Sequence, residues 1–168
     1  MKLKEGIAGK YIRNKWIAMK IKEYTFGSLP IDELHDQYIT SVLVKENEIR
    51  LIIKDFHMDE PYNNEKAEAY YDKHKNFKCC EIVFKGEDCL CSTVVKYKLK
   101  NQRIKKGKLI FIDELDALLK RKGYELQMYG MFIGYDSLII KCCFMDKVGY
   151  HGECLLRIYA DNIAYEWH

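Results

Sequence analysis

Apolar and polar residues alternate along most of this 168-residue chain, which is typical of β-strands with one buried face. The alternation predicts strands at 17–21, 38–44, 49–56, 79–84, 91–99, 125–133 and 138–144. Short turn-forming stretches at 45–48, 86–88 and 134–137 separate three successive pairs of these strands, so we expect three hairpins. The chain is therefore expected to be mostly antiparallel β-structure.

Two segments have helical patterns instead. In DELDALLKRKG (113–123), three leucines form an apolar stripe, Asp113 can cap the start, and Gly123 stands where a helix needs a left-handed stop. Residues 64–75 place small and aromatic side chains at helical spacing. We expect an α+β fold with two short helices, in a single domain spanning residues 1–168.

One nine-residue strand sequence occurs twice with small changes. LIIKDFHMD (51–59) returns as LIIKCCFMD (138–146), and IDEL precedes each copy, at 31–34 and at 112–115. The common order predicts an internal duplication, a pseudo-repeat with halves at about 16–62 and 93–150. A structural repeat would place Leu51 and Ile53 at core positions equivalent to those of Leu138 and Ile140. Chance similarity between strands rich in Leu, Ile and Lys is the alternative.

Composition restricts the cellular setting more than the activity. The net charge of +3 favours no class of partner. The first sixteen residues hold no apolar run typical of a signal peptide, and the longest uncharged run, at 126–135, is too short to cross a membrane. We therefore expect a cytoplasmic chain that binds no membrane and whose seven cysteines are thiols.

No catalytic or metal-binding pattern is visible. Cys79, Cys80, Cys89 and Cys91 resemble a metal site in spacing, but a hairpin turning at 86–88 would hold Cys79 and Cys91 about 13 Å apart. No spacing joins a histidine to a cysteine. We expect no catalytic residue, no metal and no cofactor, hence a protein that is not an enzyme. The alternative is a small enzyme with a cleft between the pseudo-repeats that uses His35, His57 or a cysteine.

The stretch 96–108 holds seven basic residues in thirteen. As a nucleic-acid interface it would use Lys96, Lys98, Lys100, Arg103, Lys105 and Lys106 on phosphates. However, the first three lysines alternate along a strand with no aromatic side chain between them on that face. They would solvate an exposed edge strand and protect it from aggregation. We prefer this second interpretation and keep the nucleic-acid binder as an alternative.

Leu34, His35, Asp36 and Ile39 precede an apolar hairpin that ends at Phe56. This pattern resembles an L-H-D-x-x-I opening found in small bacterial proteins, some of which are immunity proteins of polymorphic toxin systems. The resemblance covers about 23 of the 168 residues. It implies a non-enzymatic module that binds a cognate toxin. The alternative role of the His35–Asp36 pair is a side-chain cap at the start of the strand.

Thirteen tyrosines favour a contact surface, because tyrosine is amphipathic and loses little entropy when ordered. Tyr62, Tyr70 and Tyr71 near the acidic turn MDEPYNNE, together with His35 and Asp36, are the predicted partner contacts. Tyr129 and Tyr135 are further candidates. The predicted function is that of a cytoplasmic protein-binding module, with an immunity protein as its specific form. An exposed strand edge would also permit a homodimer.

Overall fold

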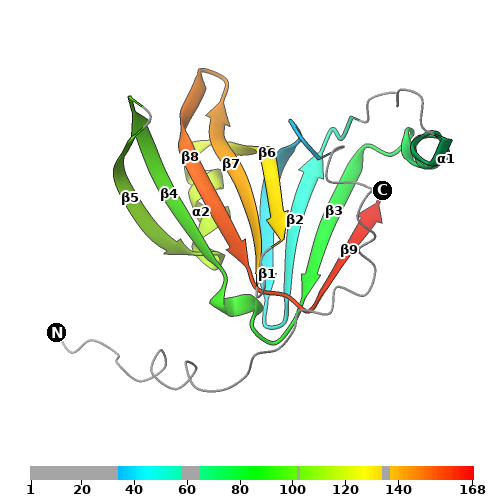
Figure 1. The fold of residues 1–168 in the computed structure, drawn as a ribbon, viewed down its shortest axis with the longest axis horizontal. Helices are drawn as coiled ribbons and strands as arrows, with labels where there is room; N and C mark the ends of the chain where they lie inside the picture. Colours follow the sequence, from blue (N-terminus) through cyan, green and yellow to red (C-terminus); the bar gives the residue numbers. More distant parts are fainter. Residues whose placement is uncertain (1–33, 58–64, 102, 134–136) are drawn as a thin grey trace.

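The computed structural model describes residues 34–57, 65–101, 103–133 and 137–168, and shows one open antiparallel sheet with two helices (Figure 1). The strand order is β5-β4-β8-β7-β6-β1-β2-β3-β9. The strands are β1 Tyr38–Lys45, β2 Glu48–Lys54, β3 Cys79–Lys85, β4 Thr93–Lys100, β5 Arg103–Phe111, β6 Glu125–Ile133, β7 Leu138–Asp146, β8 Gly149–Ile158 and β9 Asn162–Trp167. The expected mostly antiparallel α+β fold is confirmed.

Two of the three predicted hairpins are confirmed, and the one predicted around 86–88 is wrong. β1 pairs with β2, and β6 pairs with β7. β3 does not pair with β4, because β2 and β9 occupy its two edges. After β3 the chain instead passes through a short 3-10 helix, Cys89–Cys91, to the far half of the sheet, where β4 lies between β5 and β8.

The crossing after β3 requires a glycine at position 86. A Cβ atom there would lie 2.8 Å from the Asp161 nitrogen and 3.2 Å from the Ala160 Cα atom. The Asp161 N–H group donates to the Lys85 carbonyl at 2.8 Å, so the connection between β8 and β9 is held against the end of β3. The close approach of two backbones explains the glycine.

Both predicted helices are confirmed, as α1 Glu65–His74 and α2 Asp113–Lys122. α2 ends at Gly123, whose φ of 64° is left-handed. The expectation that Asp113 caps α2 is wrong, because Ile112 occupies the capping position and no side chain makes a cap hydrogen bond. Neither helix of the described ranges has the length and apolar character needed to cross a membrane.

The two faces of the sheet differ. The face against α2, here called the helix face, carries the buried core, to which α2 contributes Leu115 and Leu119. α1 also adjoins this core, through the half-buried Tyr71. The opposite face, here called the open face, is covered by neither described helix, and α2 lies behind the sheet in Figure 1.

α2 is attached to β1 through Asp116. Its carboxylate accepts hydrogen bonds from the Ser41 hydroxyl at 2.8 Å and the Val42 N–H at 3.0 Å, and it pairs with Lys120. Burial opposes ionisation of Asp116, but these hydrogen bonds outweigh burial and hold its pKa below the usual value. The carboxylate therefore fixes the position of α2 on the helix face.

The four marker residues of the expected duplication, Leu51, Ile53, Leu138 and Ile140, are all fully buried in one core cluster. Each LIIK segment belongs to a strand paired on both sides, β2 between β1 and β3, and β7 between β6 and β8. Similar burial is therefore an alternative explanation of the similar sequences. Residues 16–33 and 58–62 of the expected first half lie outside the described residues, so the duplication stays a prediction.

Candidate functional site

Apolar side chains gather on the open face at β5, β4 and β8. Leu109 and Phe111 on β5 are 61% and 56% exposed, and Leu99 on β4 is 42% exposed. Leu109, Val95 and Leu155 are direct partners across β5, β4 and β8, so their side chains form a row on one face. We call Leu99, Leu109, Phe111, Val95 and Leu155 the apolar patch.

A group of tyrosines adjoins the apolar patch. Tyr97 lies two residues from Val95 on β4 and pairs with Glu153 on β8. The Tyr129 hydroxyl donates to Glu153 Oε2 at 3.0 Å, and the Tyr150 hydroxyl lies 3.5 Å from Glu153 Oε1. Tyr129 occupies a register shift in β6 between Met128 and Gly130. These three tyrosines and Glu153 are here called the tyrosine cluster.

The phenols of the tyrosine cluster are hydrogen-bond donors at neutral pH. Burial and hydrogen bonding to Glu153 raise the pKa of Tyr97 to about 12. Burial and hydrogen bonding to Tyr97 and Glu153 raise the pKa of Tyr129 well above its usual value. Burial also raises the pKa of the more exposed Tyr150. A cluster of neutral donors around one carboxylate can bind and orient a partner, but it supplies no activated nucleophile.

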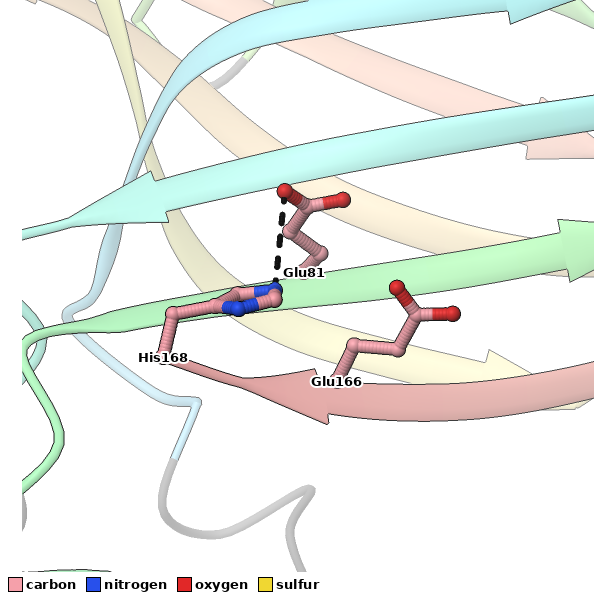
Figure 2. A group of neighbouring side chains, drawn as sticks. All are labelled: Glu81, Glu166 and His168. Atoms are coloured by element: carbon pink, nitrogen blue, oxygen red, sulfur yellow. Dashed lines mark ion pairs between the residues drawn. The ribbon is translucent and has the colours of Figure 1, made fainter.

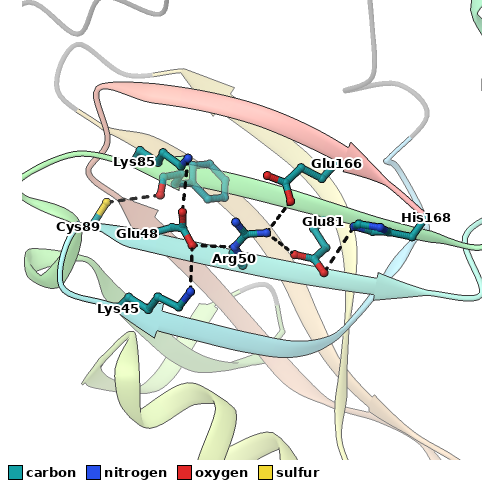
Figure 3. A network of polar contacts seen from close by, with 9 residues as sticks. Lys45, Glu48, Arg50, Glu81, Lys85, Cys89, Glu166 and His168 are labelled. Carbon is teal, nitrogen blue, oxygen red and sulfur yellow. Dashed lines mark hydrogen bonds and ion pairs between the residues drawn. The ribbon is translucent and has the colours of Figure 1, made fainter.

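The other half of the open face holds an ion-pair network centred on Arg50 of β2 (Figure 3). Arg50 donates through Nε to Glu48 at 2.7 Å, and through Nη1 to Glu81 of β3 at 2.8 Å and Glu166 of β9 at 2.6 Å. The Arg50 side chain is only 21% exposed. The hydrogen bond from Arg50 holds the pKa of Glu48 below its usual value. These four residues, the arginine network, join three strands.

Glu81, Glu166 and His168 could each direct one ligand atom to a common point, with all these atoms within 4.8 Å of one another (Figure 2). His168 Nε2 lies 3.8 Å from Glu81 Oε1. Both carboxylates, however, already accept hydrogen bonds from the Arg50 guanidinium. We therefore assign the two carboxylates to the arginine network, where both already have a cationic partner.

The hairpin from which the sequence predicted the separation of Cys79 and Cys91 is absent, because β3 and β4 do not pair. All seven cysteines are free thiols. Cys142 and Cys154 are cross-strand partners in the core, and burial raises the pKa of Cys142 well above its usual value. Such thiols behave as apolar filling rather than as nucleophiles.

His35 and Asp36 lie in the turn that leads into β1. His35 Nδ1 lies 2.9 Å from Asp36 Oδ2, and Gln127 of β6 donates to Asp36 Oδ1 at 3.1 Å. The Asp36 backbone N–H donates to the Met128 carbonyl at 2.7 Å, and the φ of Asp36 is 66°. These contacts fix the turn against β6, whereas the side-chain cap stays a prediction. A role in partner binding stays a prediction.

A cavity of about 430 Å³ adjoins His35 and is lined by Leu34, His35, Met128, Gly130, Met131, Phe132 and Ile140. The enzyme alternative requires a histidine and a carboxylate beside a cleft, and the His35–Asp36 pair provides both. None of these lining side chains is a hydroxyl or thiol nucleophile. Cys143, which hydrogen-bonds to Gln127 at 3.6 Å, has its pKa raised by burial, which disfavours the reactive thiolate.

The predicted tyrosine contacts near MDEPYNNE receive little support. Tyr62 and the side chain of Tyr70 lie outside the described residues. Tyr71 is half-buried against the core, and the Lys75 ammonium lies 5.4 Å from the centre of its ring. Tyr71 therefore contributes to packing, and its role in partner binding stays a prediction. Tyr135 also lies outside the described residues, whereas Tyr129 belongs to the tyrosine cluster.

The basic stretch 96–108 does not begin on an edge strand, contrary to the prediction from the sequence. β4 is an interior strand and β5 is the edge, so the edge-strand interpretation of Lys96, Lys98 and Lys100 is wrong. Lys96 is half-buried on the helix face, with its ammonium 4.4 Å from the Phe144 ring centre and 5.6 Å from that of Tyr124. Lys98 and Arg103 are exposed, whereas the side chains of Lys100, Lys105 and Lys106 lie outside the described residues.

Sequence reasoning missed the arginine network and the apolar patch. The signal for the network was one charged residue inside each of three apolar strands, Arg50, Glu81 and Glu166. The signal for the patch was Leu109 and Phe111, two apolar residues at alternate positions after the lysines of the basic stretch. Neither signal indicates which strands lie side by side.

Comparisons with known proteins add no assignment to this geometry. No model of a known protein family matches the chain, and no curated protein or solved structure matches it.

Proposed function

We propose that this chain is a protein-binding module whose contact surface is the apolar patch together with the tyrosine cluster. The observation that carries the proposal is the exposure of Leu99, Leu109 and Phe111 on a face that neither described helix covers. Contiguous exposed apolar surface is uncommon on proteins that act alone and marks sites of interaction. The patch provides apolar area that a partner can remove from water.

The tyrosine cluster adds specificity to this surface. Tyrosines are enriched at the energetic centres of protein interfaces, where an apolar ring and a hydroxyl act together. The exposed Tyr150 lies beside the hydrogen-bonded Tyr129 and Glu153. A partner with a hydrogen-bonding group opposite Glu153 would complete the cluster. Phosphate recognition is a poorer fit for this surface, because Lys96 lies on the other face of the sheet.

We further propose a cognate toxin as the partner, in line with the resemblance of residues 34–56 to immunity proteins. Binding alone can neutralise a toxin by covering its active surface, so no catalytic group is required. The free thiols with raised pKa and the neutral phenols described above are consistent with a protein that binds and performs no chemistry.

The test uses the tagged full-length chain and two matched variants. Leu109→Glu with Phe111→Glu places charges in the apolar patch, whereas Leu43→Glu places one at an exposed position of the same face, beside the arginine network. We expect a stoichiometric partner in pull-downs from the native host, identified by mass spectrometry. The double variant should lose it and Leu43→Glu should retain it.

Two further measurements identify the partner class. Co-expression with a toxin encoded beside this gene should restore growth for the wild type and not for the double variant. Light scattering over a range of concentrations detects a homodimer. Equal capture by the wild type and the double variant would contradict the proposed surface. Self-association through the patch would show that the partner is a second copy of this chain and not a toxin.

A further inference from the structure

A lysine-lined groove lies on the helix face between α2 and the strands β4 and β5. It has a volume of about 270 Å³ and is lined by Lys96, Tyr97, Lys98, Gly107, Lys108, Ile110 and Leu118. A second hollow of about 240 Å³ shares Lys108, Ile110 and Leu118 with it, and is extended by Glu114, Ala117 and Arg121 of α2. These two adjoining hollows, here called together the lysine groove, are lined by basic and apolar side chains, with Glu114 at one end.

The strand register brings the basic side chains together. Lys96 of β4 and Lys108 of β5 are direct cross-strand partners, so both project to the helix face. Lys98 follows two residues later on the same face of β4. Like charges directly opposite on neighbouring strands repel, which makes this arrangement unfavourable for the fold alone.

The environment of Lys96 shows this repulsion. Burial lowers the pKa of Lys96, and the charges of Lys98, Lys122 and Lys108 lower it further, against an opposing contribution from Cys154. The Lys96 ammonium is held above the Phe144 and Tyr124 rings, where a cation is stabilised by the ring faces. The position is therefore fixed while its charge is incompletely compensated.

Acidic groups of α2 and β7 have partners outside the groove. Asp116 pairs with Lys120 and β1, and Asp146 lies 2.7 Å from His151. Glu114 lines the far end of the groove. Among the described residues, no carboxylate forms an ion pair with Lys96, Lys98 or Lys108. An anion from solution would supply the missing negative charge.

We propose that the lysine groove binds a small anionic amphiphile, with a carboxylate, sulfonate or phosphate head at Lys96, Lys98 and Lys108 and an apolar body over Ile110 and Leu118. The larger hollow, of about 270 Å³, lies just below the range of about 300–1,000 Å³ found for small-molecule pockets. The groove is on the face opposite the apolar patch, so this proposal is independent of the protein-binding function.

The experiment is a fluorescence titration of the full-length chain with 8-anilinonaphthalene-1-sulfonate, followed by displacement with decanoate. Lys108→Met removes one charge and retains the apolar stem, and Lys108 is exposed, so the variant should fold. We expect Lys108→Met to weaken binding by about ten-fold, the loss expected for one charged hydrogen bond. Lys85→Met, an exposed lysine of the open face, should leave binding unchanged.

A second variant separates the groove from the apolar patch, which could also bind the dye. Leu109→Glu should leave the titration unchanged. Loss of binding in Leu109→Glu with none in Lys108→Met would overturn the proposal. Equally effective displacement by inorganic phosphate and by decanoate would also overturn it, because the apolar side chains would then contribute nothing to binding. Displacement by single-stranded DNA alone, with a steep dependence on salt, would replace the amphiphile with nucleic acid.

Discussion

The arginine network and the tyrosine cluster lie on the same open face and are both built around glutamates, yet they differ in how the carboxylates are satisfied. In the network, Glu48, Glu81 and Glu166 each form an ion pair with Arg50. In the cluster, Glu153 accepts from phenols, and no cation of the described residues pairs with it. In the first group every carboxylate has a cationic partner, while the carboxylate of the second has none among the described residues and lies beside the apolar patch. We therefore expect the network to stabilise the sheet and the proposed partner to contact the cluster.

The largest effect should follow removal of Arg50, which pairs with all three glutamates of the network. Arg50→Met would leave three carboxylates close together, and we expect the free energy of unfolding to fall by about 2–4 kcal/mol, somewhat below the loss for a fully buried ion pair. Urea denaturation at neutral pH measures this. Lys45→Met, which removes an exposed cation 3.8 Å from Glu48, is the matched control and should cost under about 1 kcal/mol. Equal losses in the two variants would show that Arg50 is not central.

The two groups should limit stability at opposite ends of the pH scale. The folded-state pKa of Glu48 is lowered, so its contribution is present above its ordinary value of 4.5 and is lost as pH falls through the lowered pKa. Tyr97 has a raised pKa, so its contribution is present below its ordinary value of 10 and is lost as pH rises to about 12.

Thermal denaturation between pH 2 and 12 tests this prediction. Arg50→Met should reduce the fall in melting temperature at acid pH and leave the fall at alkaline pH unchanged. Tyr97→Phe should reduce the alkaline fall and leave the acid fall unchanged. If Tyr97→Phe does not change the loss of stability at high pH, ionisation of Tyr97 is not its cause.

A smaller effect is expected inside the tyrosine cluster. Tyr129→Phe removes the hydroxyl that donates to Glu153 at 3.0 Å, and we expect a loss of about 1 kcal/mol. Tyr150→Phe removes a longer contact of 3.5 Å from an exposed ring, so its effect on unfolding should be below about 0.5 kcal/mol. A larger loss for Tyr150→Phe than for Tyr129→Phe would reverse the assigned order of the two hydrogen bonds.

The smallest effect on stability should come from the apolar patch. Phe111→Ser changes a ring that is 56% exposed on the edge strand, and the free energy of unfolding should change by about 0.5 kcal/mol or less. Partner binding should nevertheless weaken by at least about ten-fold, as at interface positions occupied by aromatic anchors. A strong loss of stability would show that Phe111 packs within the fold and is not available as a partner contact.

Much of the local structure was predictable, since it depends on neighbours in the sequence. Alternation located β1, β2, β6 and β7, and the leucine stripe with Gly123 located α2. The candidate site was not predictable in the same way. Glu81 and Glu166 meet Arg50 only because β9 pairs with β3, and Tyr129 reaches Glu153 only because β6 and β8 flank β7.

The sequence by itself determined the strands, the helices and which residues of each strand share a face, because these follow from local geometry and periodic burial. Only the tertiary structure decided the strand order and the partners of charged residues. The segment 86–88 reads locally as a hairpin turn, yet pairing of β3 with β9, some eighty residues later, occupies that edge. Lys96 reads as a solvated residue and is half-buried above Phe144. Both outcomes depend on contacts between distant segments, whose free energy no local pattern records.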